Sequence, residues 1–132
     1  MSRLLPLILL SILLMACDVP NNDNATEKAV EPYTIVASVA GPKNQANIQR
    51  VVHTVLIDSS YLDKIESNIM PSLIKKYDDR NMNQFFLYAK DPIDIRALKG
   101  KDIIDVYRAA KKGSIALINK SVADDGILLY EY

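Results

Sequence analysis

The chain is poor in the residues that build metal sites and disulfide frameworks. Its 132 residues include one cysteine, one histidine and no tryptophan, and its 16 basic residues are balanced by 16 acidic ones. A lone cysteine excludes a disulfide scaffold, and a lone cysteine with a lone histidine excludes a zinc site made from those residues. A net charge of zero excludes a strongly basic nucleic-acid-binding protein, so we expect no nucleic-acid partner. The length fits one domain.

The longest apolar run is too short to span a bilayer. It covers residues 4–14, follows a short basic segment at residues 1–3, and is closed off by Asp18. A spanning helix needs roughly 20 apolar residues. A buried core helix would be unusual at this position, because a polar tract follows at once. The pattern is typical of a cleaved export signal.

The only cysteine lies at the end of this run, in the sequence Leu14-Met15-Ala16-Cys17. These residues resemble the lipobox of bacterial lipoproteins. The resemblance implies that the signal is removed before Cys17 and that palmitate-type chains acylate the thiol and the new amino group. Two or three chains anchor stably, since each buried methylene contributes ~0.8 kcal/mol. A single cysteine in an exported chain has no internal partner, so we interpret Cys17 as a lipidation site and not as a nucleophile. In enteric-type lipoproteins an aspartate at the position of Asp18 implies retention in the inner membrane.

Composition divides the chain into three parts. Residues 1–16 are the expected signal peptide, residues 17–32 the acylated cysteine with a flexible tether, and residues 33–132 the folded domain. The tether has too few apolar residues to fold, and a linker of this length spans roughly 20 Å.

The domain is expected to be α+β, with the element order ββαβαββ. Strands are predicted at residues 33–39, 50–57, 83–90, 114–119 and 127–132, and helices at 58–77 and 102–112. Pro71 should kink or split the first helix near Asn68, because proline removes one intrahelical hydrogen bond. Gly113 stands where a helix-terminating glycine belongs.

The preferred arrangement is a single two-layer domain. It has one mixed sheet of about five strands, with both helices on one face. A strand–helix–strand passage is expected to cross over between parallel strands, and the hairpins at the two ends are expected to be antiparallel. A rival packing places one helix on each face. The nearly continuous apolar runs in the second, fourth and fifth strands keep that alternative open.

Few residues are available for chemistry. The chain has no glycine-rich phosphate loop, no Gly-x-Ser-x-Gly and no His-Glu-x-x-His. His53 is the only candidate general base, and strand alternation places it with Val51, Val55 and Ile57 on a largely apolar face, which favours a packed histidine. The sequence identifies no nucleophile or carboxylate for it. We therefore expect no catalytic residue, no enzyme activity and no cofactor.

Acidic and aromatic residues also have simple interpretations. The pairs Asp78-Asp79 and Asp124-Asp125 lack the spacing of a calcium loop, so we interpret them as turn formers and expect no metal site. The seven tyrosines are expected to line the margin of the core. A tyrosine cluster on one sheet face would instead indicate a binding surface.

These observations predict a non-catalytic lipoprotein of the bacterial cell envelope. We expect the lipid to anchor it in the membrane, on the periplasmic side, and the domain to bind a periplasmic or membrane protein. An alternative is a module that binds a small ligand or a cell-wall fragment between sheet and helices. An enzyme is the third possibility, and a cleft that brings a carboxylate to His53 would favour it.

Replacing the cysteine tests the anchor. In Cys17→Ala the acyl acceptor is absent, so metabolic labelling with a palmitate analogue should mark the wild type and leave the variant unmarked. Asp18→Ala is the matched control and should label like the wild type, because it keeps the thiol. Equal labelling of Cys17→Ala and wild type would contradict the lipoprotein interpretation.

Overall fold

A mixed β-sheet forms the centre of the domain. The computed structural model describes residues 31–121 and 126–131, and all of these except Glu31 belong to a compact unit running from Pro32 to Tyr132. The α+β class and the element order agree with the prediction. The elements in chain order are β3 (Tyr33–Ala40), β4 (Arg50–Ile57), the 3-10 turn η3 (Ser59–Tyr61), the π-helical turn η4 (Ile65–Ile69), α1 (Met70–Lys76), β5 (Met82–Tyr88), the 3-10 turn η5 (Ile95–Leu98), α2 (Ile103–Lys111), β6 (Ala116–Ser121) and β7 (Gly126–Glu131).

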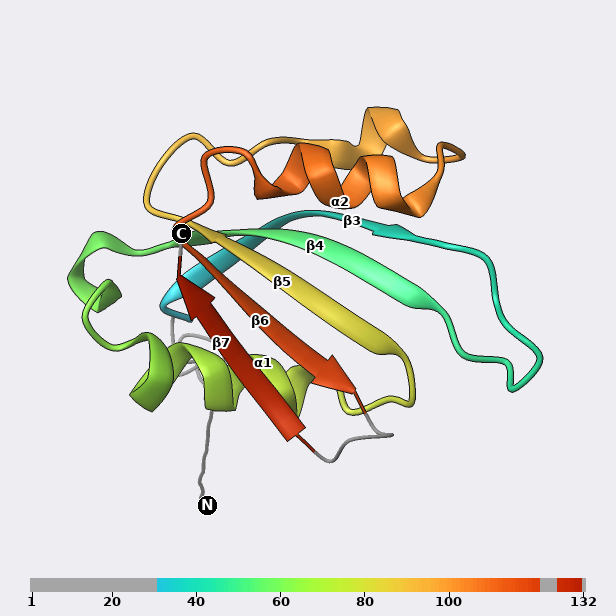
Figure 1. Ribbon diagram of the computed structural model, residues 1–132. Helices are drawn as coiled ribbons and strands as arrows, with labels where there is room; N and C mark the ends of the chain where they lie inside the picture. Colours follow the sequence, from blue (N-terminus) through green and yellow to red (C-terminus); the bar gives the residue numbers. More distant parts are fainter. Residues whose placement is uncertain (1–30, 122–125, 132) are drawn as a thin grey trace, which may run out of the picture. The chain divides into compact units, whose positions relative to one another are not determined.

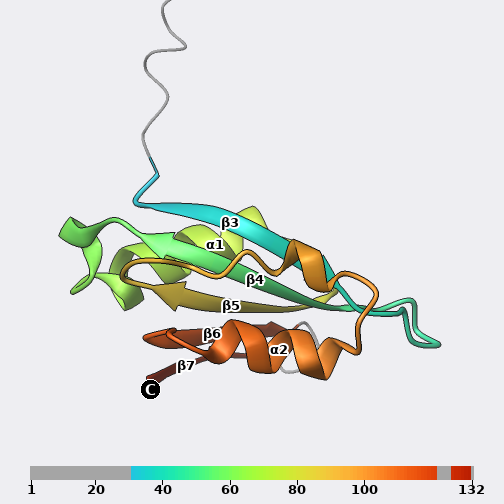
Figure 2. The same ribbon diagram turned by 90° about the horizontal axis from the view of Figure 1, so that it is seen from above.

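The five strands lie side by side in chain order, β3-β4-β5-β6-β7 (Figure 2). β4 and β5 are parallel, whereas the β3–β4, β5–β6 and β6–β7 pairs are antiparallel. The predicted hairpins at both ends of the domain are therefore confirmed. β3 and β7 form the two edges of the sheet.

The passage from β5 to β6 differs from the expectation. A crossover between parallel strands was predicted, but β5 and β6 are antiparallel. Figure 1 shows the reason: the chain runs outward over the sheet to η5 and returns along α2 to the end of β5 that it left. The backbone N–H of Ile115 then donates to the carbonyl of Leu87 at 2.7 Å. Because the segment crosses one face of the sheet twice, it returns to the end of the sheet where β5 finished. β6 starts there and must therefore run antiparallel to β5.

The helices lie on opposite faces of the sheet, so the two-layer arrangement with both helices on one face is wrong (Figure 1). On one face Val55 and Phe85 pack with Leu73 of α1. On the other face Val52 and Phe86 pack with residues of α2. Below we call these the α1 face and the α2 face. The rival packing is the observed one because β4 and β5 are apolar on both sides, and each side needs a cover.

The predicted first helix is divided, as Pro71 indicated. Asp58 caps the opening turn by accepting a hydrogen bond from the backbone N–H of Ser60. A π-helical turn follows and ends at Ile69, and the α-helix begins at Met70 with Pro71 in its first turn. Proline is tolerated there because the first N–H groups of a helix have no partner inside the helix.

The second helix begins and ends within one residue of the prediction. Asp102 accepts a hydrogen bond from the N–H of Ile104 at 2.9 Å and caps α2. Gly113 follows the helix with φ of 78°, a left-handed conformation that glycine adopts without strain. Among the residues that the structure describes, no helix is long and apolar enough to cross a bilayer.

One buried hydroxyl in the α2 face lacks a partner. Thr54 is fully buried, and within the described residues no group accepts or donates a hydrogen bond at its Oγ1. A buried polar group without a partner lowers stability. Valine has the same shape and no hydroxyl.

Thr54→Val should therefore not lower the free energy of unfolding, and an increase should be about 1 kcal/mol. Urea denaturation of the full chain measures this. Thr34→Val is the matched control: Thr34 lies exposed on β3, so its replacement should change stability little. A loss of stability in Thr54→Val larger than in the control would show that the hydroxyl has a partner in solution.

Candidate functional site

The predicted lipidation and sorting residues cannot be placed in this fold. Cys17 and Asp18 lie outside the described residues, so the anchor remains a prediction. The structure does place His53, the only candidate general base, in β4 with 1% of its surface exposed.

A β-bulge in the edge strand brings a hydroxyl to His53. Ile35 pairs with Val55 and Ala37 with Thr54, so Val36 is an additional residue in β3. An additional residue inverts the alternation of side chains after it. Ser38 is thereby paired with His53 and faces it on the α1 face. Without the bulge, Ser38 would lie on the opposite face.

Four polar groups form one hydrogen-bonded chain through His53, which we call the His53 chain. The Asn83 amide nitrogen donates to Asp79 Oδ1 at 2.9 Å, and this turns Asn83 Oδ1 toward His53. Nε2 of His53 must then carry a hydrogen and donate to Asn83 Oδ1 at 2.9 Å. Nδ1 of the neutral ring is an acceptor, and the Ser38 hydroxyl lies 2.6 Å from it.

Aromatic rings enclose the imidazole. Phe85 stacks on it with ring centroids 4.7 Å apart, and Tyr77 packs against it at 4.5 Å. Burial lowers the pKa of His53, although the hydrogen bond with Asn83 and the charge of Asp79 raise it in part. Burial also raises the pKa of Tyr77, against smaller lowering effects of Lys76 and of a hydrogen bond with Ser38. At neutral pH His53 is therefore an uncharged ring with both nitrogens occupied.

The loop before β5 holds the other end of the His53 chain. Asp79 Oδ1 also accepts from the N–H of Asn81 at 2.9 Å, which is the turn-forming role that the sequence predicts. Lys120 of β6 donates to the carbonyl of Asp79 at 3.2 Å. The paired residues Asp124-Asp125 lie outside the described residues. Within residues 31–121 and 126–131, no three side chains of His, Cys, Asp or Glu converge as metal ligands.

The α2 face carries a second polar group that the sequence analysis missed. Arg50 Nε donates to Gln84 Oε1 at 2.6 Å, and Gln84 Nε2 donates to Asn119 Oδ1 at 2.8 Å. We call these three residues, from β4, β5 and β6, the polar row. The Arg50 guanidinium lies over the ring of Tyr107 from α2, 4.9 Å from its centroid.

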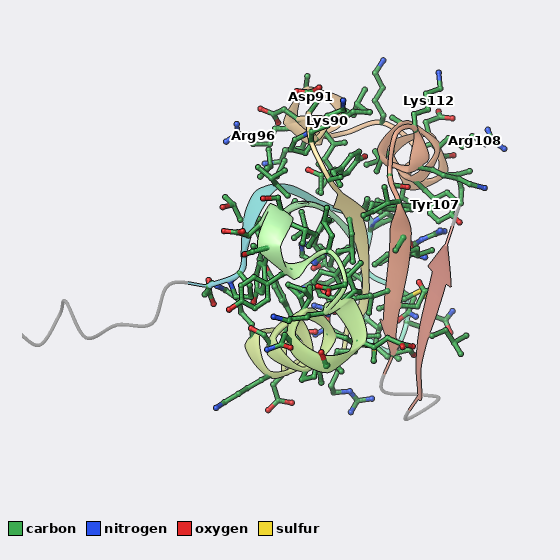
Figure 3. All side chains as sticks on the ribbon, turned by 90° about the vertical axis from the view of Figure 1, so that its left-hand side faces the viewer. Lys90, Asp91, Arg96, Tyr107, Arg108 and Lys112 are labelled. Atoms are coloured by element: carbon green, nitrogen blue, oxygen red, sulfur yellow. The ribbon has the colours of Figure 1, made fainter. Side chains whose placement is uncertain are left out.

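This part of the α2 face is only partly covered. Arg50, Tyr107 and Asn119 are half-buried, while Met82 is 40% and Leu128 53% exposed. Leu128 pairs with Asn119 across the β6–β7 hairpin, so it lies next to the polar row on the side of the sheet edge. We call Arg50, Tyr107, Asn119, Met82 and Leu128 together the open face. Figure 3 shows Tyr107 on the sheet side of α2, whereas Arg108 points away from the domain.

Of the five tyrosine side chains that the structure describes, three lie at the core margin as expected and two are buried in the core instead. Tyr33 and Tyr88 are buried in the core, and Tyr61, Tyr77 and Tyr107 pack at its margin. Tyr88 donates to the carbonyl of Ala110, and burial raises its pKa to about 12. The side chains of Tyr130 and Tyr132 lie outside the part of the chain that the structure describes.

Comparisons with protein-family models, with curated proteins and with solved structures found no match for this chain. The candidate sites therefore rest on geometry alone. One signal in the sequence could have indicated them: Asn83 and Gln84 are adjacent polar residues at the start of an apolar strand. Alternation sends one to each face, and each becomes the centre of a polar group.

The buried histidine should make stability depend on pH. An unfolded histidine binds a proton below about pH 6.5, whereas the lowered pKa keeps folded His53 neutral to lower pH. The unfolded state then binds more protons, so the free energy of unfolding should fall as pH decreases below about 6.5, by up to about 1.4 kcal/mol per pH unit. Urea denaturation of His53→Gln between pH 7.5 and 5 should show a smaller decrease than the wild type.

Ser38→Ala is the matched variant, because it removes the hydroxyl that His53 contacts and keeps the titrating ring. It should retain the wild-type decrease with pH. If His53→Gln and wild type lose stability in parallel, His53 titrates normally in the folded domain.

Proposed function

We propose that this chain is a lipid-anchored protein of the bacterial cell envelope, and that its domain binds a protein partner through the open face without catalysing a reaction. The anchor rests on the lipobox-like residues that end at Cys17. Binding rests on the structure of the α2 face. The proposed location is the periplasmic side of the membrane, and Asp18 favours the inner membrane.

The observation that carries the proposal is the composition of the open face. Met82 on β5 and Leu128 on β7 expose large apolar side chains; Met82 pairs with Arg50, which lies over Tyr107, and Leu128 pairs with Asn119. Tyrosine and arginine are enriched at the energetic centres of protein interfaces. Exposed apolar residues that gather around a polar group are typical of docking surfaces.

The edge of the sheet adds to this support. β7 is paired with β6 on one side only, so it ends the sheet next to the open face. A partner that covers the open face would therefore also meet a strand edge. Partners commonly add a strand to such an edge through backbone hydrogen bonds.

The His53 chain favours a structural role over catalysis. A general base must reach the reacting group, but His53 is 1% exposed and both of its nitrogens already have partners. Its lowered pKa also makes it a weaker proton acceptor. The His53 chain instead joins β3, β4 and the loop before β5, and so holds the bulged edge strand in register.

Photo-crosslinking in the membrane tests the proposal. A photoreactive benzoylphenylalanine at position 128 of the full, lipidated chain should form one adduct of defined mass. The matched control is the same residue at position 62, because Leu62 is also an exposed leucine but lies in the segment next to η3. Position 62 should form no such adduct. No adduct at position 128, or the same adducts at both positions, would contradict binding through the open face.

A further inference from the structure

The polar row shows what kind of group the open face is built to bind, and this inference rests on the proposed function. We propose that Arg50 binds the carboxylate of an acidic side chain, Asp or Glu, on the protein partner, and that the Asn119 amide donates to a second acceptor of the same partner segment. The argument depends on which atoms of the polar row remain available.

Arg50 is held in place without a carboxylate. Its Nε is used by Gln84 and its plane lies over Tyr107, which leaves the two terminal nitrogens of the guanidinium. Two nearby acidic residues already have other partners, because Asp94 pairs with Arg96 and Asp105 with Arg108. In the part of the chain that the structure describes, no acidic side chain pairs with Arg50. A half-buried cation in a fixed orientation is thus available to an anion from outside.

The hydrogen bonds also give the polar row a direction. A guanidinium only donates, so Gln84 must turn its oxygen toward Arg50 and its nitrogen toward Asn119. Asn119 then accepts through Oδ1, and its Nδ2 group remains as a donor. Both ends of the polar row therefore present N–H groups. A ligand that fits must accept at both ends, and the positive charge of Arg50 selects an anion over a cation or an alkyl group at that end.

The surroundings select a carboxylate carried by a protein. The two terminal nitrogens of a guanidinium match the two oxygens of a carboxylate, and such charge-assisted pairs are stronger than neutral hydrogen bonds. Met82 and Leu128, at 40% and 53% exposure, would contact apolar side chains next to that carboxylate. An acidic residue flanked by apolar residues in a partner segment meets both requirements, whereas a free phosphate uses only the donors.

The test uses the full chain, purified from membranes in detergent, and two tripeptides. The probes are N-acetyl-Leu-Glu-Leu-amide and the matched N-acetyl-Leu-Gln-Leu-amide, which differ only in the charged group. NMR titration follows the Arg50 Nε–H and the Asn119 side-chain amide. The glutamate peptide should shift both signals and bind at least 10-fold more tightly than the glutamine peptide.

Variants connect this affinity to the polar row. Arg50→Gln should weaken binding of the glutamate peptide at least 10-fold. Arg50→Lys, which keeps the charge but not the planar fork, should weaken it less. Lys75→Gln is the matched control, because it removes one exposed positive charge from α1 on the other side of the sheet, and it should leave binding unchanged. A wild-type-like amide spectrum establishes that each variant is folded.

Three results would overturn the inference: equal affinity for the two tripeptides, a loss of affinity in Lys75→Gln equal to that in Arg50→Gln, or inorganic phosphate shifting the same signals as strongly as the glutamate peptide.

Failure of the proposed function gives a different set of results. If the position 128 adduct forms but Arg50→Gln leaves it intact, the docking surface stands and the carboxylate is wrong. If the glutamate peptide binds but position 128 forms no adduct, the carboxylate site stands and docking of a partner on the open face is wrong.

Discussion

The parallel pairing of β4 with β5 is the constraint on which the rest of the domain depends. Both strands carry buried side chains on both faces, such as Val52 and Val55 in β4 and Phe85 and Phe86 in β5. Neither face can be left in water, because burial of apolar surface is the main driving force of folding. One helix must therefore cover each face. The α1 segment connects the parallel pair on one side, and η5 with α2 covers the other.

The same pair of strands explains where the polar groups lie. Arg50, Asn83 and Gln84 lie near the beginnings of β4 and β5, and both strands end in apolar residues. Parallel register sets Arg50 beside Met82 and Val52 beside Gln84. Alternation then sends Asn83 to His53 on the α1 face and Gln84 to Arg50 on the α2 face. The two polar groups differ in their surroundings: aromatic rings enclose His53, whereas the open face leaves Arg50 half-buried.

This difference separates the structural role of His53 from the binding role that we propose for Arg50. A buried, neutral and fully hydrogen-bonded histidine stabilises one arrangement of its neighbours, but it offers little to a ligand. A half-buried arginine in a fixed orientation, without a carboxylate partner among the described residues, has lost part of its hydration and gains on meeting an anion.

The sequence by itself determined the local features of this protein. The β4 bounds, the division of the first helix at Pro71 and the end of the second helix before Gly113 all follow from contacts between residues close in the chain, so composition and spacing predicted them. Tertiary structure alone decided the faces that the helices cover, the antiparallel direction of β6 and the bulge at Val36. It also decided the hydrogen-bond partners of His53 and Arg50, which come from strands 15 to 34 residues away in the chain. Periodicity shows that a strand has two faces, but only packing shows what covers each face. A single bulge residue inverts every side chain after it, and no local pattern in β3 marks where that inversion occurs.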